Sequence, residues 1–449
     1  MSNLGQGRRI LILDQVGGPS TAETMTLPPN TPLTINGLHG FKLVGVFGGA
    51  TGNPRGAPYI SGDVATNNGS GAVIQVLNTD AYQLEGFLVR NRVATAHGIS
   101  IDKSARGFLH KVHVLGDPVN PGDGFRVVSG TAGQLVILQC GTAGCRNGIH
   151  LAFDVTGQPQ AVTVQSGRFE GIHGGVCIRI EADVADRGLN ALEFSGVSTS
   201  GPCPAYDITG GFGVLIHGQH YLEHTRDWDI ENAAYAGGPS PTITFRTTTT
   251  HQLRAGEQVI VTAMTPGQYN YNGPITSSDP VDRTFVVPGP ASNPGAVTQR
   301  GYATVEVPIV RIRAIGTDQT LEDNWAHDVT IEDNYFHEFA RTGGWSTTEK
   351  TAQHVDANGC FNLSMRNNQH RGNLAGLTTN NPVIHLRANT RGCVGHINHV
   401  SGGDRSMKES VPAKIFLNEG AGNYGSWWDP ATVGGRRYKK WGTWPTDPV

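Results

Sequence analysis

The sequence is poor in charge, in aromatic residues and in long apolar runs. Charged residues make up 16% of the 449 positions and aromatic residues 7%. A coiled coil or helical bundle would be rich in Ala, Glu, Lys and Leu, so this composition argues against both. No stretch approaches the roughly 18 apolar residues of a membrane-spanning helix. The net charge of −3 leaves no large basic field that would bind nucleic acid.

Cysteine is also scarce. The six cysteines form no CxxC pair, and the 17 histidines include no HExxH or spaced Cys/His set. We therefore expect buried free thiols, no structural metal and no cofactor. The apolar run after Arg8 and Arg9 is shorter than the region of about 7–15 residues in a signal peptide. The sequence thus predicts a protein made in the cytoplasm without an export signal.

What the sequence does contain is glycine and a short repeat. Glycine accounts for 61 residues, about twice its usual share of roughly 7%. A glycine followed by alternating apolar residues recurs at spacings of 24–27 residues, at Gly98, Gly124, Gly148 and Gly175. A second strand-like segment lies between successive starts, as in FLHKVHVLG from Phe108. Alternation with period 2 predicts short β-strands and argues against helices.

The period narrows the choice of fold. A unit of about 25 residues with two short strands cannot bury its own apolar face, so it must stack on its neighbours. Propeller blades are longer and four-stranded. We therefore predict an all-β, right-handed single-stranded parallel β-helix of about ten coils, with a large β-sandwich as the alternative. Side chains such as Ile99, Phe125 and Ile149 would point inward, and Asn334 and Asn367 would bond along the stack.

One segment, between Gly213 and Pro308, breaks the period. It has strand signals of its own and the turn signal Asn272–Gly273, which predict an inserted small β module. The last segment holds four of the seven tryptophans and a basic cluster, as expected of a cap or an intersubunit clasp. The expected organisation is an N-terminal segment 1–24, β-helix parts 25–240 and 307–422, the module 241–306, and the cap or clasp 423–449.

The inserted segment carries a specific order of residues: His251, Leu253, Gly256, Val259 and Val261, then Tyr271-Asn272-Gly273, then Thr284, Phe285 and Val287. This order resembles small β modules of phage tail, fibre and baseplate proteins. The surrounding repeat resembles the pectate-lyase-like β-helices of phage tailspikes and of polysaccharide lyases and hydrolases.

These resemblances imply a phage virion protein, made in the host cytoplasm, that forms a homotrimer and contacts other virion proteins. It would recognise a cell-surface polysaccharide. Whether it also degrades that polysaccharide stays open, so an enzyme activity as a depolymerase is neither expected nor excluded. The alternatives are a free polysaccharide lyase or glycoside hydrolase, and a purely structural virion component.

The densest acidic stretch offers a candidate active site. If Val329 and Ile331 point inward, the acidic residues beside them point outward, and the next coils add a cation and an imidazole. Adjacent coils are about 4.8 Å apart, close to the carboxylate separation of retaining glycosidases. The candidate catalytic residues are Asp328, Glu332, Arg366 and His396, with Asp356 in a turn-like stretch between them. An ordinary solvated face is the alternative.

A second row of outward side chains is expected on another sheet. Guanidinium and imidazole groups there would hold an acidic polysaccharide by charge-assisted hydrogen bonds. Solvation or burial against another chain is the alternative. The candidate glycan-binding residues are Arg126, His150, Arg311, Arg313, His385 and Arg387, with Arg179 and His217 expected in the same row.

Overall fold

The computed structural model describes most of the chain. The described residues are 10–14, 24–28, 31–46, 58–62, 71–91, 96–116, 121–128, 134–153, 161–182, 191–201, 203–222, 224, 226–251, 253–305, 308–337, 354–372, 384–402, 416–428 and 438–442. They are all β apart from turns and two short 3₁₀ helices, η2 (Gly267–Tyr269) and η3 (Glu322–Asn324). Within these ranges no helix has the length and apolar character needed to cross a bilayer.

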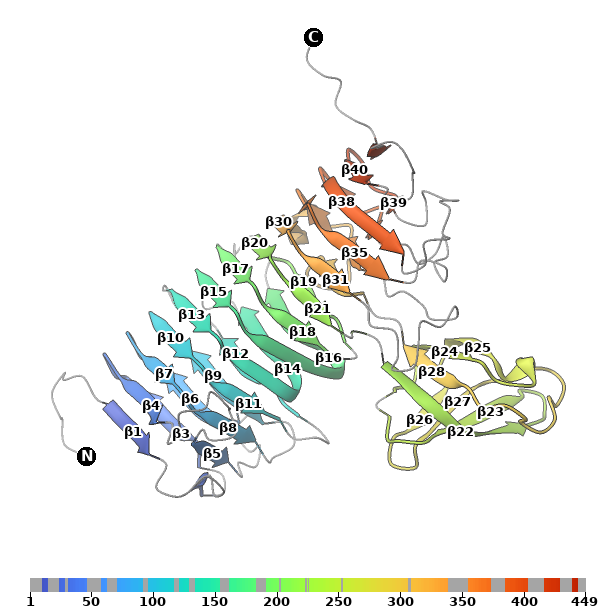
Figure 1. Ribbon diagram of the computed structural model, residues 1–449, viewed down its shortest axis with the longest axis horizontal. Helices are drawn as coiled ribbons and strands as arrows, with labels where there is room; N and C mark the ends of the chain where they lie inside the picture. Colours follow the sequence, from blue (N-terminus) through green and yellow to red (C-terminus); the bar gives the residue numbers. More distant parts are fainter. Residues whose placement is uncertain are drawn as a thin grey trace, which may run out of the picture.

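Most strands belong to three long ladders in which each strand pairs in parallel with strands from the preceding and following repeats (Figure 1). The chain passes through the first, second and third ladder in turn and then returns to the first. The first ladder consists of β2 (Thr24–Leu27), β5 (Tyr59–Gly62), β8 (Leu88–Asn91), β11 (His113–Leu115), the beginnings of β14 (Gly141–Phe153) and β16 (Arg168–Ala182), β18 (Ser198–Ser200), β21 (His220–Leu222), β31 (Tyr335–His337), β35 (Gln369–Gly372) and the end of β38 (Val394–Gly402).

The second ladder carries the candidate glycan-binding residues. It consists of β3 (Leu33–Asn36), β6 (Ala72–Leu77), β9 (His97–Asp102), β12 (Phe125–Val128), the later parts of β14 and β16, β19 (Tyr206–Thr209), β29 (Val310–Arg313), β32 (Val355–Asn358), β36 (Ile384–Leu386) and β39 (Phe416–Asn418).

The third ladder carries the acidic stretch. It consists of β1 (Ile10–Asp14), β4 (Lys42–Val46), β7 (Gln83–Glu85), β10 (Gly107–His110), β13 (Leu135–Leu138), β15 (Val162–Gln165), β17 (Leu192–Ser195), β20 (Phe212–His217), β30 (Ala326–Glu332), β33 (Cys360–Phe361), β34 (Ser364–Arg366), β37 (Thr390–Arg391), the start of β38, and β40 (Tyr424–Trp428), to which β41 (Tyr438–Gly442) is antiparallel.

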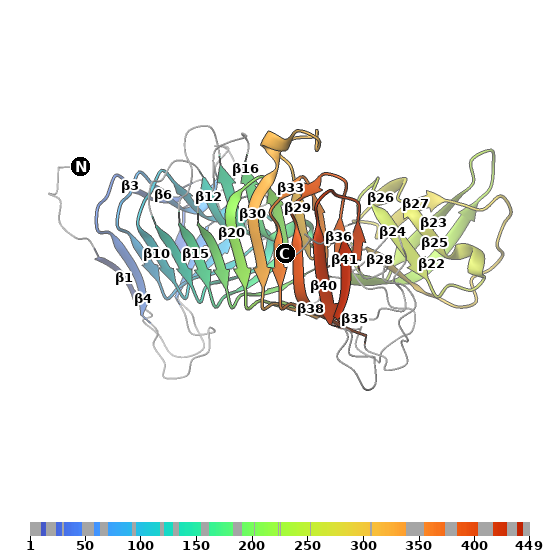
Figure 2. The same cartoon turned by 90° about the horizontal axis from the view of Figure 1, so that it is seen from above.

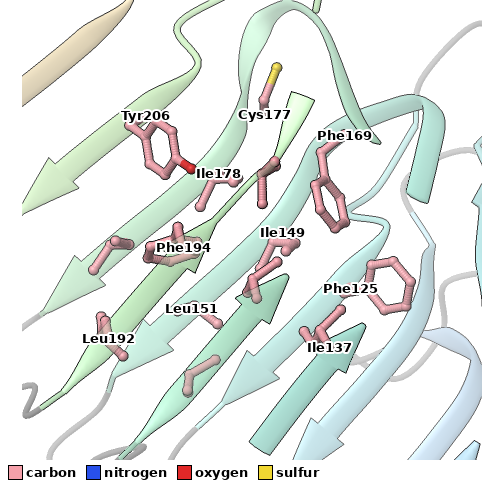
Figure 3. Packing of buried hydrophobic residues seen from close by; sticks show 14 of the residues in the cluster. Phe125, Ile137, Ile149, Leu151, Phe169, Cys177, Ile178, Leu192, Phe194 and Tyr206 are labelled. Carbon is pink, nitrogen blue, oxygen red and sulfur yellow. The ribbon is translucent and has the colours of Figure 1, made fainter. Parts of the chain in front are cut away.

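The core lies between the ladders and follows from the alternation in the sequence. In β12, Phe125 and Val127 are buried while the two residues beside them are partly exposed. Equivalent positions on the two neighbouring strands, Ile99 and Ile149, face Phe125 from either side. Figure 3 shows Phe125 and Ile149 in this core. The inward assignment made from the sequence is therefore confirmed. The all-β chain with long parallel ladders is compatible with a β-helix-like fold.

The recurrent glycine has a steric cause. A Cβ at Gly124 would lie 2.4 Å from Thr142 Cγ2 and 2.7 Å from the carbonyl oxygen of Gly148. A Cβ at Gly98 would likewise lie 2.8 Å from the carbonyl oxygen of Gly124. Neighbouring repeats approach so closely where these strands begin that any side chain would collide with the backbone of the next repeat.

Asparagine side chains bond along the stack, as the sequence predicted. Buried Asn334 donates to Asn368 Oδ1 at 3.0 Å and accepts from the backbone N–H of Gln219 at 2.9 Å. Asn367, which has a left-handed φ of 49°, donates to Asp333 Oδ1 at 2.6 Å. These bonds satisfy polar groups where the strands end, and they join residues that belong to different repeats.

The inserted segment forms a separate antiparallel sheet of seven strands, which projects from the side of the stack (Figures 1 and 2). Its own small core includes Trp228, Phe245 and Phe285. The sheet begins at residue 226, before the expected boundary at 241, because β22 pairs with both β23 and β28. Its strands are β22 (Arg226–Ala236), β23 (Thr242–Thr247), β24 (Gln258–Thr262), β25 (Tyr271–Pro274), β26 (Ser277–Asp279), β27 (Thr284–Pro288) and β28 (Tyr302–Val305).

Candidate functional site

The outer side of the second ladder carries charged residues in register over seven successive strands. From β12 to β36, the residues that face one another in order are Arg126, His150, Arg179, Asp207, Arg311, Asp356 and His385. Beside this column lie Glu181, Arg313 and Arg387, and Asp123 lies just before β12. We call these eleven residues the charged face.

Asp207 is the most buried acid of the charged face, with a side chain only 3% exposed. Its carboxylate accepts hydrogen bonds from Nε and Nη2 of Arg311 at 3.2 and 2.6 Å. It accepts a second pair from Nε and Nη2 of Arg313 at 3.2 and 2.7 Å. The two arginines are two residues apart on β29, so the alternation of a strand sends both side chains to the same face. Two guanidinium groups share one carboxylate, so the three side chains together carry one net positive charge. Both arginine side chains remain partly exposed, so this charge is accessible to a ligand.

His150 links Asp123, just before β12, to Glu181 on β16. Its Nδ1 lies 2.9 Å from Asp123 Oδ2, and its Nε2 lies 3.1 Å from Glu181 Oε2. An imidazole can donate at both nitrogens only when it is protonated. Burial alone would lower the pKa of His150, but the hydrogen bonds to Asp123 and Glu181 outweigh burial and raise it. Below its raised pKa, His150 is therefore a buried cation between two carboxylates.

The same bonds keep the two acids ionised. The hydrogen bond from His150 lowers the pKa of Glu181 to about 2, with Arg179 2.9 Å away as a further cause. Burial tends to raise the pKa of Asp123, but hydrogen bonds from His150 and Asn147 outweigh it and lower the pKa. Glu181 is the accessible member of this network, so it can accept hydrogen bonds from a ligand at any ordinary pH.

Asp356 belongs to the charged face and not to the acidic stretch. It lies within β32, where it faces Arg311 and His385, and the turn-like position expected from the sequence is wrong. Its carboxylate accepts hydrogen bonds from Nε and Nη2 of Arg387 at 2.6 and 3.1 Å. His385 is buried beside it, with Nε2 3.3 Å from Glu419 Oε1. Asp356 thus neutralises one of the cations expected to bind a glycan.

The other four candidate catalytic residues all belong to the third ladder, where three of them are adjacent and Asp328 lies four residues before Glu332 on β30. Glu332 faces Arg366, which faces His396, on the adjacent strands β30, β34 and β38. Arg366 Nε lies 3.9 Å from Glu332 Oε2, and exposed Asp328 accepts a hydrogen bond from Asn362 at 3.1 Å. The side chain of His396 lies outside the described residues.

His217 also belongs to the third ladder, where it faces Glu332 on β30. Its expected place in the row of Arg126 and His150 is therefore wrong. Its Nε2 lies 3.2 Å from Glu193 Oε1 on the preceding strand.

Sequence reasoning missed the acids that organise the charged face. Asp207 lies between the inward residues Tyr206 and Ile208, so its outward direction was readable from the alternation in AYDITG. Glu181 ends the recognised strand GVCIRIE, and Asp123 directly precedes the recurrent Gly124. The sequence does not show which acid lies against which cation, because the inserted module separates Asp207 from Arg311 in the chain.

The charged face offers hydrogen-bond donors and acceptors but no ready metal site. Across the described part of the chain, no three His, Cys, Asp or Glu side chains are grouped to hold a metal ion. Comparisons with protein-family models and with curated protein sequences found no match. The geometry suits binding of a polar ligand that carries a negative charge near Arg311 and Arg313.

Proposed function

We propose that the chain is a right-handed single-stranded parallel β-helix of about ten coils that binds an acidic cell-surface polysaccharide. In this proposal it is a virion protein of the phage tailspike or tail-fibre kind. The observation that carries the binding function is the excess positive charge where Arg311 and Arg313 share the buried carboxylate of Asp207. The three parallel ladders support the β-helix, because the chain passes through them in a fixed order.

The arginine pair suits a carboxylate, sulfate or phosphate group on a sugar. Each guanidinium has five N–H donors in a rigid plane, and Asp207 occupies only part of them. Because the carboxylate fixes both guanidinium planes, little side-chain freedom is lost when a ligand binds. Glu181 on a nearby strand stays ionised and would accept hydrogen bonds from sugar hydroxyls.

The virion assignment rests on the resemblance of the repeat and of the inserted module to phage tail proteins. A homotrimer would place one ladder of each subunit against its neighbours, and the projecting module would be available to other virion proteins. Native mass spectrometry tests the trimer: a mass near three times 47.8 kDa supports it, and a stable monomer contradicts it.

Binding is tested with a panel of immobilised polysaccharides that carry uronate, sialate or phosphate groups, with neutral dextran for comparison. We expect the full chain to bind at least one acidic polymer and Arg313→Gln to bind it at least tenfold more weakly. Arg168→Gln is the matched control, because Arg168 is an exposed cation on the first ladder. Equal binding by wild type and Arg313→Gln, or a preference for dextran, contradicts the proposal.

Cleavage of the polysaccharide is a second candidate function. It is favoured by Glu332, whose carboxylate lies 3.9 Å from Arg366 on the adjacent strand. A general acid and a base or nucleophile are what glycoside cleavage needs. Loss of polymer chain length on incubation, abolished in Glu332→Ala and Asp328→Ala, supports it. An unchanged chain length leaves the protein as a binding protein only.

A further inference from the structure

Two exposed phenylalanines occupy one column at the edge of the third ladder. Phe212 faces His327, and His327 faces Phe361, on three successive strands. The phenylalanines are 43% and 39% exposed. The rings of His327 and Phe361 lie 5.7 Å apart between centroids at an interplanar angle of 54°. Single exposed apolar side chains are ordinary, but these two lie on alternate rungs of one column, and the only other large apolar side chains exposed to this degree in the described residues are Met25, Val281 and Leu321.

The aromatic column (Phe212, His327 and Phe361) borders the charged face. Phe212 comes three residues after Thr209, the last residue of β19, and Phe361 comes three residues after Asn358, the last residue of β32. Thr209 and Asn358 both face Arg313, from the strands on either side of it. In the coils of Phe212 and Phe361 a single turn therefore separates the aromatic column from the neighbours of Arg313, whereas in the coil of Arg313 itself the chain reaches His327 through a longer connection that contains η3.

Polar groups border the aromatic column on its other sides. Asp328 and Asn362 follow directly in the chain and hydrogen-bond to each other at 3.1 Å. Beyond Phe361 the column continues with Arg391, whose guanidinium lies 5.8 Å from the ring centre of Trp325. The surface is thus a short apolar strip between hydrogen-bonding groups.

We propose that the aromatic column is a stacking subsite for the sugar rings of the polysaccharide. This inference rests on the proposed function and names the part of the ligand that this subsite binds. The C–H groups on one face of a pyranose ring carry a small positive charge, and they pack on the negative face of an aromatic ring. The hydroxyl groups at the edge of the sugar would meet Asp328 and Asn362, while the negative group would reach Arg313 around the turn.

The strip is too small to be a docking surface for a second copy of the chain. A specific protein interface buries about 800 Å² on each partner. A whole aromatic side chain supplies about 150–250 Å², and Phe212 and Phe361 expose less than half of theirs. The bordering acid, amide and guanidinium groups would also need partners in such an interface. A narrow amphipathic chain such as a glycan fits the strip better.

The experiment uses the full chain and the polysaccharide panel described above. Phe212→Ala and Phe361→Ala remove outward rings, and Val281→Ala removes a side chain that is exposed on the inserted module. We expect each phenylalanine variant to bind at least fivefold more weakly and Phe361→Trp to bind as well as wild type or better. Stacking is not ionic, so the salt dependence of binding should be unchanged in Phe361→Ala and reduced in Arg313→Gln.

The outcomes separate this inference from the function on which it rests. Binding that weakens in Arg313→Gln but is unchanged in both phenylalanine variants overturns the stacking subsite alone. Binding that weakens in Phe361→Ala but not in Arg313→Gln supports the stacking subsite and overturns the charged one. Failure of the wild-type chain to bind any member of the panel overturns both.

Discussion

The carboxylate of Asp123, which lies just before β12, meets the imidazole of His150 on the neighbouring strand β14, with 2.9 Å between Oδ2 and Nδ1. Both side chains are nearly buried, and Glu181 closes the network on the other nitrogen at 3.1 Å. A buried cation between two acids stabilises the fold only while the cation is charged and the acids are ionised. The network therefore sets a pH window for its own contribution to stability.

The first prediction concerns the upper edge of that window. The pKa of His150 is raised in the folded protein, so its contribution is complete below the ordinary value near 6.5 and is lost as the pH rises through the raised pKa. His150→Gln should lower the free energy of unfolding by about 1.5–3 kcal/mol at pH 5.5, and by less at pH 8.5. Urea unfolding at the two pH values measures both differences.

His39→Gln is the control for that experiment, since His39 is an exposed histidine 3.1 Å from Asp80. It should change the free energy of unfolding by less than about 1 kcal/mol. The lower edge of the window belongs to Glu181, whose contribution is complete above 4.5 and declines as the pH falls toward its folded-state pKa of about 2. A penalty for His150→Gln that is the same at pH 5.5 and 8.5 would contradict the charged state of His150.

The second prediction concerns two histidines inside the stack. His354 and His370 are buried with their Nδ1 atoms 2.9 Å apart, and both rings stack on Phe336, at 5.2 and 4.6 Å between centroids. Burial, with the neighbouring His370, holds the pKa of His354 well below its ordinary value. Below about pH 6.5 the histidine of the unfolded chain binds a proton, whereas buried His354 stays neutral. The free energy of unfolding therefore decreases as the pH falls.

Lowering the pH from 7 to 5 should therefore destabilise the wild type more than the double variant His354→Leu/His370→Phe. Replacement of both rings removes the group that gains a proton only on unfolding, and it keeps an aromatic ring against Phe336. Thermal unfolding followed by circular dichroism at several pH values measures the two slopes. Identical slopes in the two proteins would mean that these histidines do not contribute to acid sensitivity.

The third prediction tests the close approach at the recurrent glycines. Gly124→Ala places a Cβ 2.4 Å from Thr142 Cγ2 and 2.7 Å from the carbonyl oxygen of Gly148. Because backbone as well as side chain must move, we expect a loss of about 1–3 kcal/mol in the free energy of unfolding. Gly267→Ala is the control, since its Cβ would have no neighbour closer than 3.8 Å. A loss no larger than that of the control would show that the repeats can separate at little cost.

Much of the fold could be predicted from the sequence because each repeat shows the same pattern of a glycine followed by alternating apolar residues. The alternation around Phe125 gives the inward residues, and the glycine that precedes each apolar run marks the close approach of the next repeat. The placement of Asp356 failed because long connections before β30 and after β31 make the count of strands ambiguous. Without that count, a residue cannot be assigned to the second or the third ladder.

The ion pairs of the charged face could not be predicted from the sequence either. Sequence reasoning identified Arg311, Arg313 and Arg387 as free cations on one face. The acids that hold them, Asp207 and Asp356, come from other strands, and the first is separated from Arg311 by about a hundred residues of chain. Partners across a ladder depend on register, and register depends on three-dimensional stacking more than on local pattern.

The last prediction tests whether Asp207 organises the arginine pair. Asp207→Asn removes the charge that accepts four hydrogen bonds from Arg311 and Arg313 and leaves their positive charges facing each other. Loss of one partner of a fully buried charge pair costs about 3–5 kcal/mol. Both guanidinium groups are partly exposed here, and water would solvate them, so we expect a loss of about 2–3 kcal/mol.

Asp80→Asn is the matched control, because Asp80 also binds an arginine, Arg106, but both side chains are exposed. Its cost should stay below about 1 kcal/mol, as is usual for ion pairs in water. Urea unfolding of both variants and of wild type at pH 7 measures the difference. If the two substitutions lower the free energy of unfolding by the same amount, burial does not strengthen the ion pairs of Asp207 with Arg311 and Arg313. The guanidinium groups would then lack the fixed positions on which recognition of an acidic sugar depends.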